Sequence, residues 1–384
     1  MFQAKGQIRM KNDMLGIIFA ENPEAGMGEL TSVRSLAAVP FGGRYRIIDF
    51  VLSNMVNSSI INVGITTPYN YQSLRDHLGT GKPWDIDRKG NGLFLLPPKE
   101  NHNYAKPCGG VDILNGVSHY LAKSSQNYVL VCDCNTICNI DYSDVLRFHM
   151  ENNADITLIY TEIPMVSERE LSKRILIDVD VESRVHDMQV YPIQQNTNKS
   201  YMHMFIIDKG LLMELVGDAV AHNKHYISKD VLLPNIDRMK VLGYKFSGYS
   251  RQINNIKNFF DVNLELLEKD VREELFGQKT HMPIYTKIKD TIPTKYGKNA
   301  VVSNSLIANG CVIEGTVKNS ILFRGVHVGK GAMVENSIVM QNSEVMENCL
   351  IENVVFDKEV IIKSGKKLVG QDTYPMVIGK KTIV

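Results

Sequence analysis

Apolar residues follow two different periods along the chain. Up to about residue 265, short apolar runs alternate with segments in which apolar residues recur every three or four positions. This alternation predicts strands separated by helices, packed as an α/β domain whose mostly parallel sheet has helices on both faces. The predicted strands are Met14–Phe19, Ile60–Thr66, Tyr128–Cys132, Ile156–Tyr160 and Met204–Ile207.

Two segments of this part carry the clearest helical signals. Residues 46–58 and residues 254–271 have apolar side chains at helical spacing, so each would bury one face. The positions are Ile48, Val51, Leu52, Met55 and Val56 in the first, and Ile256, Phe260, Leu264 and Leu267 in the second. Ligands of such α/β sheets bind beyond the carboxyl ends of the strands. We therefore expect a site near residues 20–30, 66–72, 108–112 and 133–136.

After about Tyr296 the helical period disappears. Short β-branched segments punctuated by Asn and Gly repeat as VSNSLI, VKNSIL, VENSIV and MENCLI, with Ser305, Ser320, Ser337 and Cys349 at the shared position. Such repeats predict a parallel β-helix. Their spacings of 15, 17 and 12 residues are irregular, so an antiparallel sheet is the alternative. The predicted domains are residues 1–265 (α/β), 266–295 (linker) and 296–384 (β-helix).

Composition indicates a soluble globular protein. A chain of 384 residues is too long for one ordinary core, and it is 44% hydrophobic and 22% charged. The formal net charge of +1 gives no general affinity for polyanions, so we expect no nucleic-acid partner. No run of 18 apolar residues and no signal-peptide-like N-terminus are present, and the six cysteines show no disulfide spacing. These features predict a cytoplasmic protein with no membrane partner.

Two further signals are weaker. Cys132, Cys134 and Cys138 have the spacing C-x-C-x₃-C without a matching downstream cluster, so we expect them to pack as small apolar side chains rather than to bind a metal. His327 lies in the predicted β-helix, and hexapeptide-repeat acyltransferases use a histidine base. An acyltransferase is therefore a third functional alternative.

One segment carries a specific resemblance. Residues 38–54, AVPFGGRYRIIDFVLSN, resemble the signature of the bacterial ADP-glucose pyrophosphorylases, also called glucose-1-phosphate adenylyltransferases, of glycogen biosynthesis. TTPYNYQSLRDHLGTGKPWDID, YISKDVLLPNI and YKFSGYSRQINNIKNFFDVNLELL are similar to other segments of that family. The resemblance spans nearly the whole chain. It implies a Rossmann-like nucleotidyltransferase domain, a C-terminal left-handed parallel β-helix, Mg²⁺ and ATP as ligands, and a tetramer.

The phosphate loop of that family is altered here. In the family reaction, the phosphate of glucose 1-phosphate attacks the α-phosphorus of ATP, so the site needs backbone N–H groups and an arginine around the triphosphate. The family loop Gly-Gly-x-Gly-x-Arg-Leu falls on residues 21–27. Pro23 has no N–H to donate, Glu21 and Glu24 would repel phosphates, and Gly26 stands at the position of the arginine.

The metal and sugar-phosphate positions are altered too. The family's first metal-binding Asp aligns with Asn135, and its second carboxylate aligns with Gln252. Amides are poorer Mg²⁺ ligands than carboxylates. Asp133, two residues earlier, is the weak alternative ligand, and Tyr191 lies where the sugar-phosphate lysine is expected. We therefore assign no catalytic residue, and we expect no productive binding of Mg²⁺ or ATP.

The regulatory site of the family is partly retained. Arg34 and Arg46 match arginines that bind anionic regulators, such as a sugar bisphosphate or a nucleoside monophosphate, and Arg44 lies between them. Guanidinium groups bind phosphates with bidentate geometry. Simple ion pairing at the surface is the alternative role. Leu36 replaces a family lysine, which weakens the expected site.

Two main hypotheses follow. In the first, the chain resembles the regulatory D-type subunit of two-component glucose-1-phosphate adenylyltransferases and is inactive alone. Its partners would then be a homologous catalytic subunit in a hetero-tetramer, a phosphorylated effector, and a further copy of itself. In the second, it is an active sugar-phosphate nucleotidyltransferase that uses displaced ligands such as Asp133.

Overall fold

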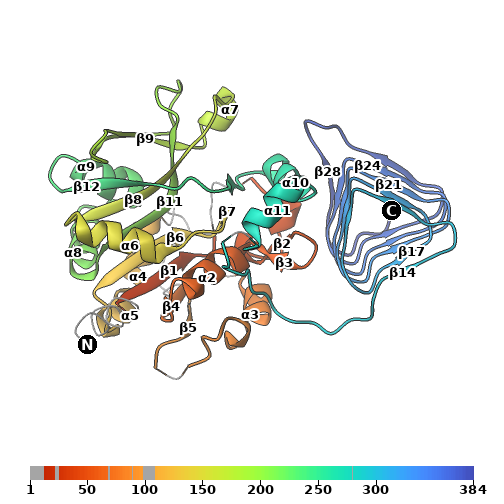
Figure 1. The fold of residues 1–384 in the computed structure, drawn as a ribbon, viewed down its shortest axis with the longest axis horizontal. Helices are drawn as coiled ribbons and strands as arrows, with labels where there is room; N and C mark the ends of the chain where they lie inside the picture. The colour runs from red at the N-terminus through yellow and green to blue at the C-terminus, as the bar shows by residue number, and fades with distance from the viewer. Residues whose placement is uncertain (1–12, 22–25, 68–69, 89, 98–108, 279) are drawn as a thin grey trace. The chain divides into compact units, whose positions relative to one another are not determined.

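The computed structural model describes residues 13–21, 26–67, 70–88, 90–97, 109–278 and 280–384. It confirms the predicted fold class, an α/β domain followed by a left-handed parallel β-helix (Figure 1). Contacts group the chain into two units. The first consists of Met1–Asn22, Val51–Tyr69 and Gly79–Ser250, and the second of Pro23–Phe50, Asn70–Leu78 and Arg251–Val384. The domain boundaries at residues 265 and 296 stay a prediction.

The first unit is built on a nine-stranded sheet with the order β10-β9-β11-β6-β1-β4-β5, extended by β8 on β11 and β12 on β8. The strands are β1 (Met14–Phe19), β4 (Val63–Thr66), β5 (Leu93–Leu96), β6 (Tyr128–Asp133), β8 (Ile156–Glu162), β9 (Ile175–Val179), β10 (Val185–Val190), β11 (Lys199–Asp208) and β12 (Val241–Lys245). All five predicted strands are present, although Ile60–Asn62 lies outside β4.

The prediction of a mostly parallel sheet is confirmed in the direction of its strands, with β10 and β11 as the exceptions. Strands β1, β4, β5 and β6 are parallel, whereas β11 runs antiparallel to β6, β8 and β9. Strands β8 and β9 therefore run in the same direction as β6, and β12 is parallel to β8, so only β10 and β11 run in the opposite direction. The sheet is therefore mixed, and its parallel half carries the carboxyl edge at Phe19, Thr66 and Asp133.

Helices cover this sheet. They are α4 (Gly110–Gly116), α5 (Ser118–Lys123), α6 (Tyr142–Glu151), α7 (Glu168–Leu171), α8 (Lys209–Ala221) and α9 (Leu233–Asn235), with η3 (Lys82–Trp84) and η4 (Ile227–Leu232). Asp141 and Asp208 begin α6 and α8 by accepting hydrogen bonds from the backbone N–H groups of Ser143 and Leu211, at 2.8 and 3.0 Å. Within the described ranges, no helix is long and apolar enough to cross a bilayer.

The remaining short elements belong neither to the nine-stranded sheet nor to the β-helix. Helix α2 (Ile47–Asn57) confirms the helix predicted over residues 46–58, and α10 (Ile256–Glu265) with α11 (Lys269–Leu275) replaces the single closing helix expected over 254–271. The others are η1 (Gly28–Thr31), η2 (Leu36–Ala38), β2 (Pro40–Phe41), β3 (Tyr45–Arg46), α3 (Gln72–Leu78), β7 (Thr136–Cys138) and β13 (Ser250–Gln252).

An aromatic cluster holds the β2–β3 hairpin within the second unit. The ring centroids of Phe41 and Phe50 lie 5.4 Å apart, and the rings of Tyr45 and Phe276 stack at 5.1 Å. Such aromatic pairs stabilise a fold by roughly 0.5–1.5 kcal/mol beyond their buried area. The Asn263 side-chain oxygen accepts a hydrogen bond from Gly42 N at 2.9 Å, where the backbone turns with a φ of +59°. The hairpin that ends at Arg46 is therefore held on both sides.

Three five-stranded parallel sheets form the β-helix (blue in Figure 1). The first contains β14 (Lys295–Tyr296), β17 (Val312–Ile313), β20 (His327–Val328), β23 (Glu344–Val345) and β26 (Ile361–Ile362). The second contains β15 (Val301–Ser303), β18 (Thr316–Lys318), β21 (Met333–Glu335), β24 (Leu350–Glu352) and β27 (Lys367–Val369). The third contains β16 (Leu306–Ile307), β19 (Ile321–Leu322), β22 (Ile338–Val339), β25 (Val354–Phe356) and β28 (Met376–Ile378).

Two ladders at one corner explain the sequence repeat. Asn304, Asn319, Asn336 and Asn353 turn the chain there with positive φ angles of 41 to 54°, a conformation that Asn tolerates. The Ser320 hydroxyl accepts a hydrogen bond from Ser337 N at 3.1 Å, and the Ser337 hydroxyl accepts one from Val354 N at 3.2 Å. Each serine thus satisfies a backbone N–H group of the next coil.

The predicted fourth member of the repeat is wrong. Val354 follows Asn353 at this corner, so the repeat spacings are 15, 17 and 17 residues. Cys349 lies at another corner, where its thiol is 3.2 Å from the carbonyl oxygen of Lys363. A valine interrupts the serine ladder, and the sequence pattern alone therefore favoured the wrong segment.

We expect the substitution Ser337→Ala to destabilise the β-helix. Ser337 is fully buried, and its loss leaves the N–H group of Val354 without an acceptor, which costs about 1–3 kcal/mol. The midpoint of urea unfolding, followed by circular dichroism, should fall. Ser303→Ala is the control, because Ser303 is exposed. Equal midpoints for the two variants would contradict this account of the repeat.

Candidate anion-binding site

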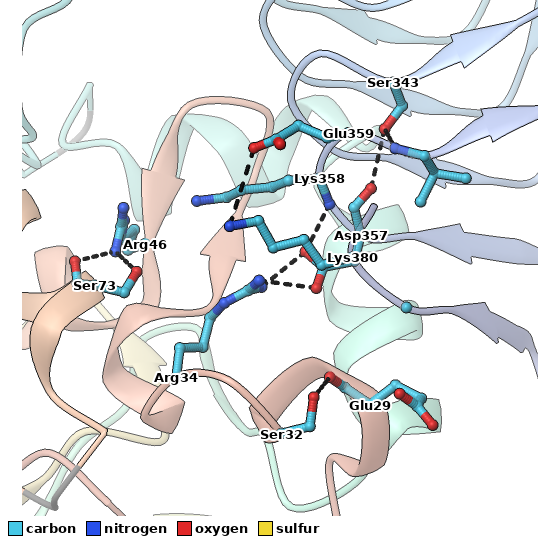
Figure 2. Close-up of polar contacts among 12 residues, drawn as sticks. Glu29, Ser32, Arg34, Arg46, Ser73, Ser343, Asp357, Lys358, Glu359 and Lys380 are labelled. Carbon is cyan, nitrogen blue, oxygen red and sulfur yellow. Dashed lines mark hydrogen bonds and ion pairs between the residues drawn. The ribbon is translucent and has the colours of Figure 1, made fainter. Parts of the chain in front are cut away.

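Arg34 forms a buried ion pair with Asp357. Its Nη1 and Nη2 atoms donate to the two carboxylate oxygens, each at 2.8 Å (Figure 2). Arg34 is 3% exposed and Asp357 is fully buried. Asp357 directly follows β25, and its carbonyl oxygen accepts a hydrogen bond from the Ser343 hydroxyl at 3.0 Å. The alternative of simple ion pairing at the surface is therefore wrong for Arg34, whose ion pair is buried, and its predicted role in anion binding stays a prediction.

Arg46 lies at the end of β3 with only part of its guanidinium satisfied. Its Nη1 atom donates to the carbonyl oxygen and the hydroxyl of Ser73 in α3, at 2.7 and 2.9 Å. Among the described residues, no acceptor lies within hydrogen-bonding distance of its other N–H groups. Burial lowers the pKa of Arg46 to about 10, with Asp49 opposing this shift and Arg34 adding to it. Arg46 therefore stays charged and keeps donors available for an anion.

Lys358 completes the centre of the site, and sequence reasoning missed it. Burial lowers the pKa of its amine to about 7, and the positive charges of Arg46 and Arg34 lower it further than Asp357 can offset. In the part of the chain that the structure describes, no carboxylate lies within 4 Å of this amine. Figure 2 shows Lys358 and Lys380 extending from the β-helix on the side of Arg46. Among the described residues, Arg46 and Lys358 therefore have no carboxylate as an ion-pair partner of their own.

Further basic residues surround this centre. Burial lowers the pKa of Lys289, and Arg324 and Arg46 lower it as well. Burial and Arg44 lower the pKa of Arg324. Arg44 is exposed and lies over the ring of Tyr45, 5.3 Å from its centroid. Arg44 thus contributes charge at the rim, whereas Arg46 and Lys358 form the centre.

The residues expected at the metal positions lie in different environments. Asn135, between β6 and β7, is 1% exposed. Asp133 ends β6, and its carboxylate lies 3.4 Å from the Nδ1 atom of His203. His203 has a positive φ of 56° and stacks on Tyr201 at 5.2 Å, and burial followed by Arg174 lowers its pKa to about 4. Sequence reasoning missed this His203 contact.

The other altered positions are placed as follows. Tyr191 is 41% exposed with a φ of 57°. Gly26 N donates to the carbonyl oxygen of Asn254 at 3.0 Å, two residues beyond Gln252 at the end of β13. Pro23 and Glu24 lie outside the described residues. Among residues that the structure describes, no three His, Cys, Asp or Glu side chains are arranged to hold a metal ion.

These donors do not fit the Mg²⁺ ion that the family resemblance implies. Asn135 and Gln252 offer neutral amides where carboxylates are required, and the carboxylate of Asp133 faces a histidine. A hard divalent cation prefers charged oxygen ligands in an open arrangement, and Asn135 is almost fully buried. We therefore derive no reaction step through a metal ion.

The cysteines and His327 match structural roles. Cys132, Cys134 and Cys138 are buried and free, and burial raises the pKa of each thiol, as expected for packed side chains. Cys108 lies outside the described residues. The ring nitrogens of His327 lie 3.4 and 3.5 Å from carboxylate oxygens of Glu314 and Glu344 on the outer face of the β-helix.

Comparisons with known proteins agree with this fold. A family model described as nucleotidyl transferase matches residues 27–269, and one described as GlmU-like, C-terminal hexapeptide matches residues 289–375. The chain is 36% identical over 369 residues to the glycogen biosynthesis protein GlgD of Bacillus subtilis (strain 168), covering 96% of both chains. It is 38% identical over 326 residues to GlgD of Geobacillus stearothermophilus, covering 85% of this chain and 84% of the relative.

A second kind of relative is also similar. The glucose-1-phosphate adenylyltransferase of Bacillus mycoides (strain KBAB4) is 32% identical over 360 residues, which cover 92% of this chain and 94% of the relative.

We expect Asp357→Ala to destabilise the protein strongly. The substitution leaves the buried guanidinium of Arg34 without a counter-ion, and breaking a buried pair from one side costs about 3–5 kcal/mol. The double variant Arg34→Met/Asp357→Leu removes both charges and should recover most of the loss. Chemical denaturation of the two variants tests this. A single variant as stable as the wild type would show that the pair is dispensable.

Proposed function

The chain belongs to the nucleotidyl transferase family, and from that premise we propose that it serves glycogen biosynthesis as a regulatory subunit beside a homologous glucose-1-phosphate adenylyltransferase. The names of the similar proteins support this pathway. The observation that carries the proposal is the absence of carboxylates at Asn135 and Gln252, the two positions that match the family's metal ligands. A chain with this frame and without those groups has surfaces for assembly but lacks the means for turnover.

The lost groups would act together in catalysis. Positioning of the triphosphate, neutralisation by Mg²⁺ and orientation of the sugar phosphate each stabilise the same transition state. Effects of residues that act as a unit are far from additive, so one restored side chain is not expected to recover activity. The altered positions Gly26, Asn135, Tyr191 and Gln252 therefore support an inactive subunit more strongly together than any of them does alone.

We further propose that a phosphorylated small molecule binds at Arg46 and Lys358. Arg46 has free N–H donors, and Lys358 has an amine without an acidic partner among the described residues. Arg34 holds the frame through Asp357, and Arg44 adds charge at the rim. A sugar bisphosphate or a nucleoside monophosphate has the charge and the oxygen acceptors that these donors require.

Regulation then follows from differential affinity. An effector that binds one conformation of a mixed tetramer more tightly shifts the population toward it. A tenfold change in apparent affinity needs only about 1.4 kcal/mol of coupling between sites, which falls within the usual range. An active nucleotidyltransferase that uses Asp133 is the second candidate, because Asp133 lies at the carboxyl end of β6 and its side chain is 19% exposed.

We expect the purified chain to synthesise negligible ADP-glucose alone and to change the kinetics of a homologous adenylyltransferase. Initial rates with Mg²⁺, ATP and glucose 1-phosphate should be measured for each chain and for an equimolar mixture, together with sedimentation of the mixture. Asn135→Asp should remain inactive. Turnover by the chain alone at the rate of the homologue would favour the Asp133 enzyme. Unchanged kinetics and no complex would refute the regulatory role.

We expect anion binding at this site to weaken as the pH rises above 7. A bound anion favours the protonated amine of Lys358, whose pKa in the free protein is about 7. Above that pH, binding must include uptake of a proton, so the affinity should fall by up to about tenfold per pH unit. Sulfate is a suitable probe for calorimetry between pH 6 and 9, because its own charge is constant there.

Three variants test this pH dependence. Lys358→Met should bind sulfate weakly and without the slope, and Arg46→Ala should bind weakly at every pH. Lys366→Met is the matched control, because Lys366 is an exposed lysine of the same β-helix. The site assignment is wrong if Lys358→Met keeps the wild-type affinity and slope.

A further inference from the structure

Lys358 differs from other lysines around the candidate anion-binding site in what its amine contacts. The amines of Lys380 and Lys381 pair with the Glu359 carboxylate, at 4.0 and 3.7 Å (Figure 2). The amine of Lys287 donates to a backbone carbonyl oxygen of α3. Among the described residues, the amine of Lys358 forms no such hydrogen bond or ion pair. Its nitrogen is therefore free to react.

The carboxylate that precedes Lys358 in the sequence is already used. The two oxygens of Asp357 accept the two N–H groups of Arg34, each at 2.8 Å. One of these oxygens also accepts the backbone N–H group of Lys358, at 2.7 Å. Three donors thus share the Asp357 carboxylate, and the side-chain amine of Lys358 has no counter-ion.

The neighbouring coils bring no acid to this amine either. Backbone hydrogen bonds of 2.9 to 3.1 Å join successive coils at this corner and give each residue an equivalent position on the next coil. The equivalents of Lys358, in coil order, are Arg324, Gln341 and Lys380. The column therefore consists of three cations and a neutral amide. Such a column attracts anions and favours the neutral form of an amine within it.

The amine of Lys358 is partly neutral near pH 7. Burial, followed by the charges of Arg46, Arg34 and Lys380, lowers its pKa to about 7, and Asp357 opposes this shift. At pH 7.5 about three quarters of the amine is then unprotonated, compared with about one in a thousand for an ordinary lysine. Only the neutral amine has an electron pair that can attack an electrophile, so a desolvated lysine beside other cations is an activated nucleophile.

We propose that Lys358 is a modification site, acylated by a small acyl phosphate whose phosphate group binds Arg46. This inference rests on the anion site proposed above, because the N–H groups of Arg46 that no described residue accepts would bind the phosphate. The bound phosphate would hold the acyl carbon beside the neutral amine. Holding two reactants together in this way replaces a bimolecular step by an effectively unimolecular one.

The reaction is an acyl transfer in which nothing is oxidised or reduced. The nitrogen of Lys358 attacks the carbonyl carbon of the acyl phosphate and forms a C–N bond. The bond between that carbon and the bridging oxygen breaks, and phosphate leaves with its electron pair. The proton that the nitrogen loses ends on the phosphate. The guanidinium of Arg46 would stabilise the negative charge that the leaving phosphate gains.

Acylation would weaken the anion site on which it depends. An amide carries no positive charge, so an acylated Lys358 attracts anions less than the amine does. We expect the acylated chain to bind sulfate as weakly as Lys358→Met does, and without the pH slope. The covalent state of Lys358 would thus control how strongly the site responds to its effector.

Incubation of the full chain with acetyl phosphate, followed by peptide mass spectrometry, tests the proposal. At pH 7.5 the initial rate at Lys358 should exceed that at Lys366, an exposed lysine of the same β-helix, by at least about tenfold. The rate at Lys358 should saturate with acetyl phosphate, and sulfate should suppress it. The rate at Lys366 should stay linear in acetyl phosphate and should not respond to sulfate.

The pH dependence of acylation should run opposite to that of anion binding. At low acetyl phosphate, the rate at Lys358 should rise from pH 6 to about 8 and then level, because the amine of the free protein is almost fully neutral there. The rate at Lys366 should continue to rise up to pH 9, since an ordinary lysine has a pKa of about 10.4.

The variant Arg46→Ala separates binding of the donor from reactivity of the amine. It should slow acylation of Lys358 by acetyl phosphate at least about tenfold and leave Lys366 unchanged. The loss should be smaller with p-nitrophenyl acetate, a neutral donor that has no phosphate for Arg46 to bind. Circular dichroism shows whether the variant is folded, and competition by sulfate in the wild type needs no variant.

Several results would overturn the proposal. They are equal rates at Lys358 and Lys366, a rate at Lys358 that stays linear in acetyl phosphate, and equal losses with both donors in Arg46→Ala. If sulfate binds with the expected pH slope but Lys358 is not acylated faster than Lys366, the anion site stands and the modification proposal fails. If sulfate does not bind and acylation does not saturate, both fail.

Discussion

The second unit depends on the buried ion pair between Arg34 and Asp357. A fully desolvated carboxylate needs a partner that supplies both charge and hydrogen bonds, and Arg34 supplies two donors at 2.8 Å. The two residues are 323 positions apart, so this pair connects the segment after η1 to the fourth coil of the β-helix. The aromatic contacts of Phe41, Phe50 and Tyr45 then hold the hairpin that places Arg46.

This pair also determines the charge of the site beside it. Because Asp357 is the carboxylate bonded to Arg34, Lys358 and Arg46 are left without an equivalent acid. Burial makes that deficit matter, since charges separated from water interact more strongly. The anion that we propose to bind here would supply the missing negative charge. At the carboxyl edge of the α/β sheet, Asn135 offers a neutral amide where the family resemblance implies a charged ligand.

Local sequence patterns predicted which residues form helices and strands better than they predicted which elements lie side by side. Strand β1 and helix α2 have strong periodicity and were found within a residue or two. The direction of β11 was missed because it depends on connections that carry no periodic signal. Resemblance indicated Arg34 and Arg46, yet nothing near Lys358 marked it, since only the folded β-helix brings Lys358 close to them. Likewise, the sequence pattern favoured Cys349 over Val354 as the fourth position of the repeat, because valine lacks the hydroxyl group found at the three earlier positions.

The β-helix holds Lys358, part of the proposed anion site, on a single packed coil. Residues 350–362 contain β24, β25 and β26, so Leu350 and Glu352 lie on the same coil as Asp357 and Lys358. Each strand of that coil is hydrogen-bonded to the coils before and after it, and its inward side chains are fully buried. Packed interiors of this kind change by discrete displacement rather than by gradual deformation. We therefore propose that an anion at Lys358 acts on the segment that carries Arg34 and Arg46, while this packed coil stays unchanged.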